Sequence, residues 1–141
     1  MTEVWPITLE LRIDWSEIDL FGHVNNLSIM KYFQAARVLC LEKIGLMQSQ
    51  AEVKIGPILA SANCQFHKPL HYPGQVVVHS RVDLVKSSSF RIVHRLADET
   101  GDLAAEAQDI IVLYDFNRGV KIAIPEALRE TITRLESAGR L

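Results

Sequence analysis

The side chains best suited to chemistry lie close together in residues 17–26. This ten-residue segment contains two carboxylates, one imidazole and two carboxamides: Glu17, Asp19, His23, Asn25 and Asn26. A long apolar segment follows, and Asn25 or Asn26 is suited to cap a helix there, because a carboxamide oxygen accepts the unpaired N–H groups of a first turn. Gly22 allows a positive φ or the close approach of a ligand to the backbone.

Asp19 and the start of the following helix together indicate a hydrolytic site. An uncapped N–H at a helix N-terminus, with the helix dipole behind it, stabilises a developing oxyanion. Asp19 precedes Asn26 by seven residues, so a loop can bring its carboxylate to the same point. There it would attack a carbonyl directly or take a proton from water. The alternative is structural, because Asp, Gly and Asn are also the ordinary residues of turns and caps.

Two elements must position this segment. Apolar and polar residues alternate over residues 5–15, which predicts a half-buried strand before it. Apolar residues then recur at three- and four-residue steps over 27–44, with Gly45 as the stop signal, and this spacing predicts a helix. The helix carries few charges, so we expect other parts of the chain to cover most of it.

The rest of the chain is interpreted as strands that surround this helix. Residues 47–56 show no clear period, and the later elements are expected at 58–67, 75–86, 90–97, 103–115 and 120–124, followed by a short helix at 126–138. Short turns between consecutive strands favour an antiparallel meander, hence an α+β fold in a single domain, 1–141. One long helix cannot cover both faces of a five- or six-stranded sheet. A curved sheet must therefore wrap the helix, with its outer face or edge against another subunit.

The composition narrows the class of protein. The 141 residues are 48% hydrophobic and 23% charged, as in an ordinary globular domain. Fifteen basic and seventeen acidic residues give a net charge of −2, which provides no electrostatic attraction to nucleic acid or an anionic membrane. No apolar run approaches the roughly 20 residues that span a bilayer. Cys40 and Cys64 lie in apolar runs, as reduced thiols do, and we expect a cytoplasmic protein.

Several other chemistries lack their motifs. His67 and His71 are four residues apart, but Pro69 between them forbids the helix that metal ligands at this spacing need, so no metal site is expected. The sequence has neither a Gly-rich phosphate loop nor a Gly-x-Ser-x-Gly elbow. Nucleotide hydrolysis and a serine-triad esterase are therefore excluded.

Polar side chains outside the segment receive structural interpretations. Arg37 is expected to pair with Glu17 or Asp14, and Glu17 to be solvated or paired with an arginine. His79 and His94 fall within expected strands, where solvated or hydrogen-bonded positions are the simplest interpretation.

Two stretches of the chain carry a family motif. The first is WSEIDLFGHVNN at 15–26, followed by KYFQAAR at 31–37. The second is FHKP at 66–69 with the Pro-Gly pair at 73–74. Together with the element order over residues 5–124, they resemble the hot-dog thioesterase superfamily, most closely its branch of 4-hydroxybenzoyl-CoA thioesterases and YbgC-type acyl-CoA thioesterases.

The resemblance implies a long central helix wrapped by a curved antiparallel sheet. It implies homodimers, or homotetramers built from two dimers, with the active sites between subunits. Asp19 matches the catalytic carboxylate, and the backbone N–H of Asn26 matches the group that polarises the thioester carbonyl. His23 joins them in the catalytic set, and Asn25 and Gly22 would line the substrate site.

The resemblance also implies contacts to an acyl-CoA substrate from other segments. The partner subunit would supply Ser61 and Asn63. Lys86, Ser88 and Arg91 match the region where relatives contact the phosphates or the pantetheine arm of CoA. CoA is part of the substrate in this interpretation, and no separate cofactor is expected.

The chain departs from the family pattern at four positions that bear on function. Gln34 replaces a common glutamate, Ile29 a common tyrosine, Gln75 an aspartate, and Pro57 a hydroxyl residue of the 4-hydroxybenzoyl-CoA enzyme. These departures make the aromatic substrate of that enzyme less suitable. We therefore expect an acyl-CoA thioesterase whose acyl group the sequence does not specify. The alternatives are a hot-dog hydratase or dehydratase, which Gln34 disfavours, a non-catalytic module that binds acyl-CoA or acyl-carrier protein, and a purely structural dimer.

Overall fold

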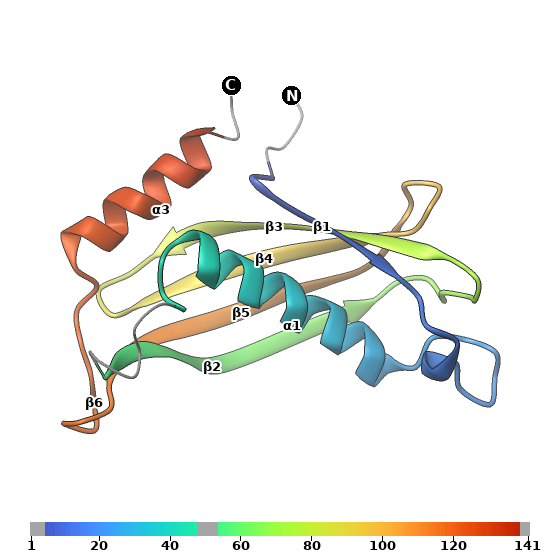
Figure 1. Cartoon of the computed structure of the whole chain (residues 1–141), viewed down its shortest axis with the longest axis horizontal. Helices are drawn as coiled ribbons and strands as arrows, with labels where there is room; N and C mark the ends of the chain where they lie inside the picture. Colours follow the sequence, from blue (N-terminus) through green and yellow to red (C-terminus); the bar gives the residue numbers. More distant parts are fainter. Residues whose placement is uncertain (1–4, 48–53, 139–141) are drawn as a thin grey trace.

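The computed structural model describes residues 5–47 and 54–138 (Figure 1). The elements, in chain order, are β1 (Ile7–Arg12), the 3-10 turn η1 (Trp15–Glu17), α1 (Asn26–Lys43), β2 (Ile55–Phe66), β3 (Gln75–Val85), β4 (Ser89–Ala97), β5 (Leu103–Asp115), β6 (Val120–Lys121) and α3 (Glu126–Ala138). The expected α+β order is confirmed. Most of the stretch without a period, 48–53, lies outside the described residues. Within the described segments, no helix is both long and apolar enough to cross a membrane.

The six strands form one antiparallel sheet in the order β1-β3-β4-β5-β2, with β6 paired to β5. Helix α1 crosses one face of this sheet, and α3 lies at the end of the sheet opposite the α1 N-terminus (Figure 1). The prediction of a central helix against a curved antiparallel sheet is therefore confirmed. β2 is an outer strand of the sheet, and most of its residues from Leu59 onward are exposed.

The first strand is shorter than its apolar alternation predicts. It ends at Arg12, and the side chain of Asp14 then caps η1 by accepting from the backbone N–H of Ser16 at 3.0 Å. Glu17 completes a capping box by accepting from the N–H of Asp14 at 2.7 Å. Trp15 therefore sits on a turn with 74% of its surface exposed, although it continues the period of the strand. A local cap has overridden the hydrophobic pattern.

A layer of polar side chains divides the core between α1 and the sheet into two apolar clusters. One cluster lies toward the N-terminus of α1 and the other toward its C-terminus and α3. Ser80, His94 and Asp109 come from three adjacent strands and are all buried between the clusters. Arg37 on α1 completes the layer through Asp109, at 2.9 Å from Nε to Oδ2. The expected pairing of Arg37 with Glu17 or Asp14 is wrong.

Candidate active site

The segment from Ile18 to Val24 forms a tight, hydrogen-bonded loop before α1. An isolated antiparallel bridge joins Ile18 to Val24. Inside it, the N–H of Asp19 donates to the carbonyl of His23 at 2.8 Å, and the N–H of Gly22 donates to the carbonyl of Asp19 at 3.0 Å. Gly22 has a φ of +84°, so the positive φ expected of this glycine is needed for the turn.

The carboxylate of Asp19 is held by this loop through one oxygen. Its Oδ1 accepts from the N–H of Phe21 at 2.9 Å and from the N–H of His23 at 3.2 Å. No group in the described part of the chain donates to Oδ2, and the residue is exposed. Oδ1 thus has the turn-forming role of the structural alternative. Oδ2 stays available to a substrate or a water molecule.

Asn25, and not Asn26, caps the helix. The Asn25 side chain accepts from the N–H of Ser28 at 2.8 Å and donates to the carbonyl of Glu17 at 3.0 Å. The backbone N–H of Asn25 donates to the same carbonyl at 2.9 Å. Asn26 is then the first residue of α1, and its N–H has no acceptor among the described residues. This N–H points out of the start of an 18-residue helix, where the dipole favours negative charge.

A second hydrogen bond ties the loop to α1 from the side of Glu17. The hydroxyl of Tyr32 donates to Oε1 of Glu17 at 2.7 Å, across fifteen residues of sequence. Tyr32 is buried, and its burial together with the neighbouring Glu17 carboxylate raises the pKa of the phenol well above its usual range. Glu17 is therefore half-buried and bonded to Tyr32, and not paired with an arginine. Tyr32 is a supporting residue that the sequence analysis missed.

The loop also docks on the connection between β2 and β3. The N–H of Val24 donates to the carbonyl of Leu70 at 2.9 Å. The rings of His23 and His71 meet edge to face with centroids 5.0 Å apart. The backbone of His23 is thus bonded to Asp19 and its ring packs against His71, while its place in the catalytic set stays a prediction. Hydrogen bonds therefore tie the segment that carries Asp19 both to α1 and to this connection.

Apolar side chains surround the loop on the outside of the molecule. Leu20 is 97% exposed and Phe21 81%, and Leu27 and Met30 extend the apolar surface along α1. Large apolar groups in one area of a surface mark a binding or association site.

Within one chain, several residues that were expected to contact the substrate lie far from the Asp19 loop. Lys86, Ser88 and Arg91 lie at or beside the β3–β4 hairpin, at the opposite end of the core from Asp19. Arg129 on α3 donates to the carbonyl of Lys86 at 2.6 Å and holds this hairpin. Arg91 pairs with Asp83 through two bonds of 2.7 and 2.8 Å.

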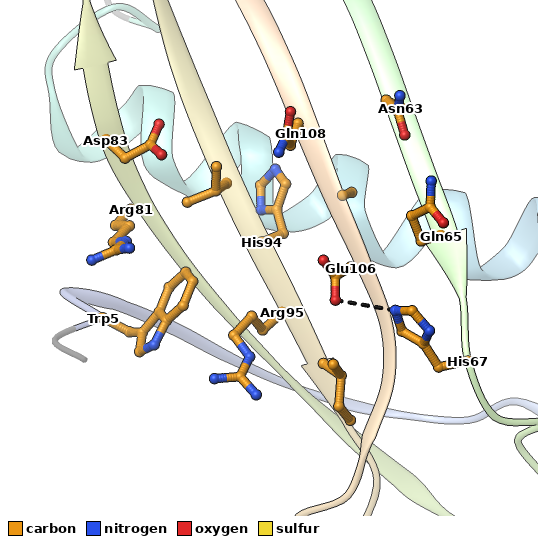
Figure 2. Close-up of a pocket in the computed structure, with 13 residues that line it drawn as sticks. Trp5, Asn63, Gln65, His67, Arg81, Asp83, His94, Arg95, Glu106 and Gln108 are labelled. Carbon is orange, nitrogen blue, oxygen red and sulfur yellow. Dashed lines mark hydrogen bonds and ion pairs between the residues drawn. The ribbon is translucent and has the colours of Figure 1, made fainter. Parts of the chain in front are cut away.

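Ser61 and Asn63 lie on the edge strand β2. Asn63 points, with Gln65 and His67, into a hollow of about 640 Å³ on the sheet face that α1 does not cover (Figure 2). Nε2 of His67 and Oε2 of Glu106 form a hydrogen bond of 3.0 Å in this hollow. Among the described residues, no group of three or more His, Cys, Asp or Glu side chains is placed to bind a metal ion.

Comparison with known proteins identifies the family. A sequence model described as the thioesterase-like superfamily matches residues 13–132, a span that contains the loop, α1 and the five strands from β2 to β6. The chain belongs to the thioesterase-like superfamily. Its fold is therefore the hot-dog fold, and the family is one of thioester hydrolases.

Three proteins similar to this thioesterase-like chain are themselves named as thioesterases. A thioesterase from Thermus thermophilus, solved in complex with coenzyme A and zinc, is 25% identical and superimposes with a TM-score of 0.84 over 96% of this chain and 98% of its own. A 1,4-dihydroxy-2-naphthoyl-CoA thioesterase from Synechocystis is 19% identical, with a TM-score of 0.81 over 92% and 97% of the two chains. YneP of Bacillus subtilis, provisionally named an acyl-CoA thioesterase, is 22% identical over 92% of this chain and 94% of its own.

Proposed function

We propose that the protein hydrolyses an acyl-CoA thioester to a carboxylic acid and free CoA. One observation carries the proposal: a single hydrogen-bonded loop joins the Asp19 carboxylate, with its open Oδ2, to the uncapped N–H of Asn26 at the start of α1. An N–H that binds the carbonyl oxygen and a carboxylate that acts as nucleophile or base are together sufficient for thioester hydrolysis. The choice of substrate is supported by the thioesterase solved with coenzyme A and by the relative named for its action on 1,4-dihydroxy-2-naphthoyl-CoA.

The mechanism follows from these two groups. The thioester carbonyl oxygen accepts from the N–H of Asn26, which stabilises the negative charge that develops when the carbonyl carbon is attacked. In one route, Asp19 attacks the carbon, the CoA thiolate leaves and is protonated, and water then hydrolyses the mixed anhydride to restore Asp19. In the other, Asp19 takes a proton from a water molecule, which attacks the carbon and displaces the thiolate. His23 and Gly22 line the site in both routes, and Asn25 maintains the helix start.

We further propose that the active unit is a homodimer paired along β2. This strand is twelve residues long, lies at the sheet edge and exposes Leu59 and Phe66. An unprotected apolar edge of this kind is a template for pairing with a second copy. A two-fold axis at the edge turns the partner end for end. The partner's Lys86 hairpin then lies at the same end as this chain's Asp19 loop, as the expected CoA contacts require.

The catalytic proposal is tested with Asp19→Asn. The amide oxygen of asparagine still accepts from Phe21 and His23, so the loop keeps its shape while the carboxylate is lost. Thiol release from an acyl-CoA should fall by about a thousandfold, because both routes need the carboxylate. Asp115→Asn is the matched control, since Asp115 accepts in the same way from the N–H groups of Asn117 and Arg118 in a distant turn. An Asp19→Asn enzyme as active as this control contradicts the proposal.

Edge pairing is tested separately through Leu59→Lys. A charge on an edge strand opposes pairing with a second copy. Sedimentation should show a dimer for the parent chain and a monomer for the variant, with an unchanged far-ultraviolet dichroism spectrum. A parent chain that sediments as a monomer at micromolar concentration contradicts this part of the proposal.

A further inference from the structure

The polar layer in the core is one continuous hydrogen-bonded chain. Ser80 on β3 bonds Nδ1 of His94 on β4 at 2.6 Å, and Nε2 of His94 bonds Oδ2 of Asp109 on β5 at 2.7 Å. Arg37 on α1 then donates through Nε to the same oxygen at 2.9 Å, and through one terminal nitrogen to the other carboxylate oxygen at 3.4 Å. The catalytic proposal uses none of these four residues.

The chain is closed at one end and open at the other. Ser80 is completely buried between β1 and β4. Arg37, at the other end, keeps 15% of its side-chain surface exposed, against 1% for Asp109. Of its five N–H donors, two go to Asp109 and no other described group accepts from it. The layer therefore presents unused donors on one side only.

At this open end, Arg37 lines a small cavity between α1 and strands β2 and β5. Its volume is about 50 Å³, and its walls include Met30, Phe33, Arg37, Cys64 and Asp109. The two apolar helix residues form one part of the wall, and the Arg37–Asp109 ion pair forms another. The cavity thus combines hydrocarbon contact with a charged boundary.

The cavity lies on the same stripe of α1 as the proposed carbonyl site. Asn26, Met30, Phe33 and Arg37 are spaced at i, i+4, i+7 and i+11, which places them in one row along the helix. At 1.5 Å per residue, Arg37 is about 16 Å from Asn26 along the axis, and its side chain leans back toward the N-terminus. An acyl group that starts at the N–H of Asn26 and follows this row passes Met30 and Phe33 before it meets Arg37.

We infer that Arg37 and Asp109 determine which acyl groups the protein accepts, an inference that rests on the proposed acyl-CoA function. A short or medium acyl chain ends beside Met30 and Phe33. A longer hydrocarbon covers the open side of Arg37 and removes water from its donors without replacing the lost hydrogen bonds, which is unfavourable. An acyl chain of medium length with a terminal hydroxyl offers an acceptor to those donors. The favoured substrates are therefore medium-length acyl groups, with terminal oxygen preferred over hydrocarbon.

The parent enzyme provides the first test, with butanoyl-, octanoyl-, 8-hydroxyoctanoyl- and hexadecanoyl-CoA as substrates. We expect kcat/KM for hexadecanoyl-CoA to be at least about tenfold below that for octanoyl-CoA, and the hydroxylated chain to exceed the plain one by a similar factor. Equal values for all four substrates overturn the inference and leave the proposed function intact.

The second test is the double variant Arg37→Met with Asp109→Asn. Methionine keeps an unbranched side chain without the charge, and asparagine keeps an acceptor for His94. The variant should lose the preference for the hydroxylated chain and hydrolyse hexadecanoyl-CoA to within about threefold of octanoyl-CoA. The matched control is His67→Asn with Glu106→Gln, which alters a hydrogen-bonded pair on the opposite face of the sheet and should keep the parent profile. A double variant with the parent profile contradicts the inference.

Binding separates this inference from the catalytic proposal and does not require turnover. The probes are the corresponding S-alkyl-CoA thioethers, which cannot be hydrolysed, with affinities measured by calorimetry. If no acyl-CoA releases thiol but the thioethers follow the expected order of affinity, the catalytic proposal fails and the inference holds. If the thioethers bind without regard to length or terminal oxygen, or do not bind, the inference is refuted.

Discussion

Removal of the Tyr32 hydroxyl should loosen the Asp19 loop without disturbing the core. In Tyr32→Phe the ring keeps its place and only the 2.7 Å hydrogen bond to Glu17 is lost. A hydrogen bond to a charged group contributes about 1.5–3 kcal/mol. Glu17 is only half-buried, so water replaces part of the bond, and the N–H of Asp14 still donates to the same oxygen. We therefore expect a loss of about 1–2 kcal/mol in the free energy of unfolding.

Urea denaturation measures this loss, and thiol release measures its effect on the loop. Because Glu17 also accepts from both nitrogens of Asn25 through its carbonyl, a shift of Glu17 moves the helix cap and the Asp19 loop together. We expect kcat to fall by about tenfold while the KM for acyl-CoA changes less. Tyr114→Phe is the control, because the Tyr114 hydroxyl has no hydrogen-bond partner among the described residues and its ring contacts Phe116. If Tyr32→Phe matches this control in stability and in kcat, the bond to Glu17 does not hold the loop.

Three further predictions concern the pH dependence of stability, the space around Gly74 and the reactivity of the two cysteines. Burial opposes the charge on Asp109, but hydrogen bonds from His94 and Arg37 outweigh this effect and hold the pKa of Asp109 below its usual value. The stability that this group contributes is therefore present above about pH 4 and is lost as the pH falls through the lower folded pKa. Between pH 6 and pH 2, the free energy of unfolding should decline less in Asp109→Asn than in the parent chain. Gly74→Ala should lower the free energy of unfolding by about 1–2 kcal/mol in urea, because a Cβ there would lie 3.0 Å from the carbonyl oxygen of His71. Burial raises the pKa of Cys40 to about 12 and also raises that of the half-buried Cys64, so iodoacetamide at pH 8 should label Cys64 slowly and Cys40 only after unfolding, as mass spectrometry would show.

The parts of the site that depend on neighbouring residues could be predicted from the sequence. The Asp19 turn, the positive φ of Gly22 and the start of α1 are each determined within a few residues by turn and cap chemistry. The same local chemistry also explains an error, because the cap by Asp14 ended the strand before the apolar alternation reached Trp15.

The supporting contacts could not be predicted in the same way. Arg37 and Asp109 are 72 residues apart, and Tyr32 and Glu17 are fifteen. Which carboxylate meets the arginine depends on the register of three strands and on the rotation of α1 above them. A single sequence shows which residues are charged but not how the strands align. Glu17 and Asp14, the carboxylates nearer in sequence, were therefore the natural partners to predict for Arg37, and that prediction was wrong. The Tyr32 hydroxyl gave no signal at all, because its ring fits the apolar row of the helix.

The polar layer itself argues for a role beyond architecture. Strands β3, β4 and β5 keep a continuous antiparallel register past Ser80, His94 and Asp109, so backbone pairing does not require these side chains. Replacing a buried ion pair with apolar residues of similar volume often leaves a protein equally stable or makes it more stable. A layer that served packing alone would also be closed at both ends, since a buried polar chain is most stable when every member is satisfied. This one ends at Arg37 against a cavity, and that asymmetry is why its effect should appear in the acyl-group profile and not only in stability.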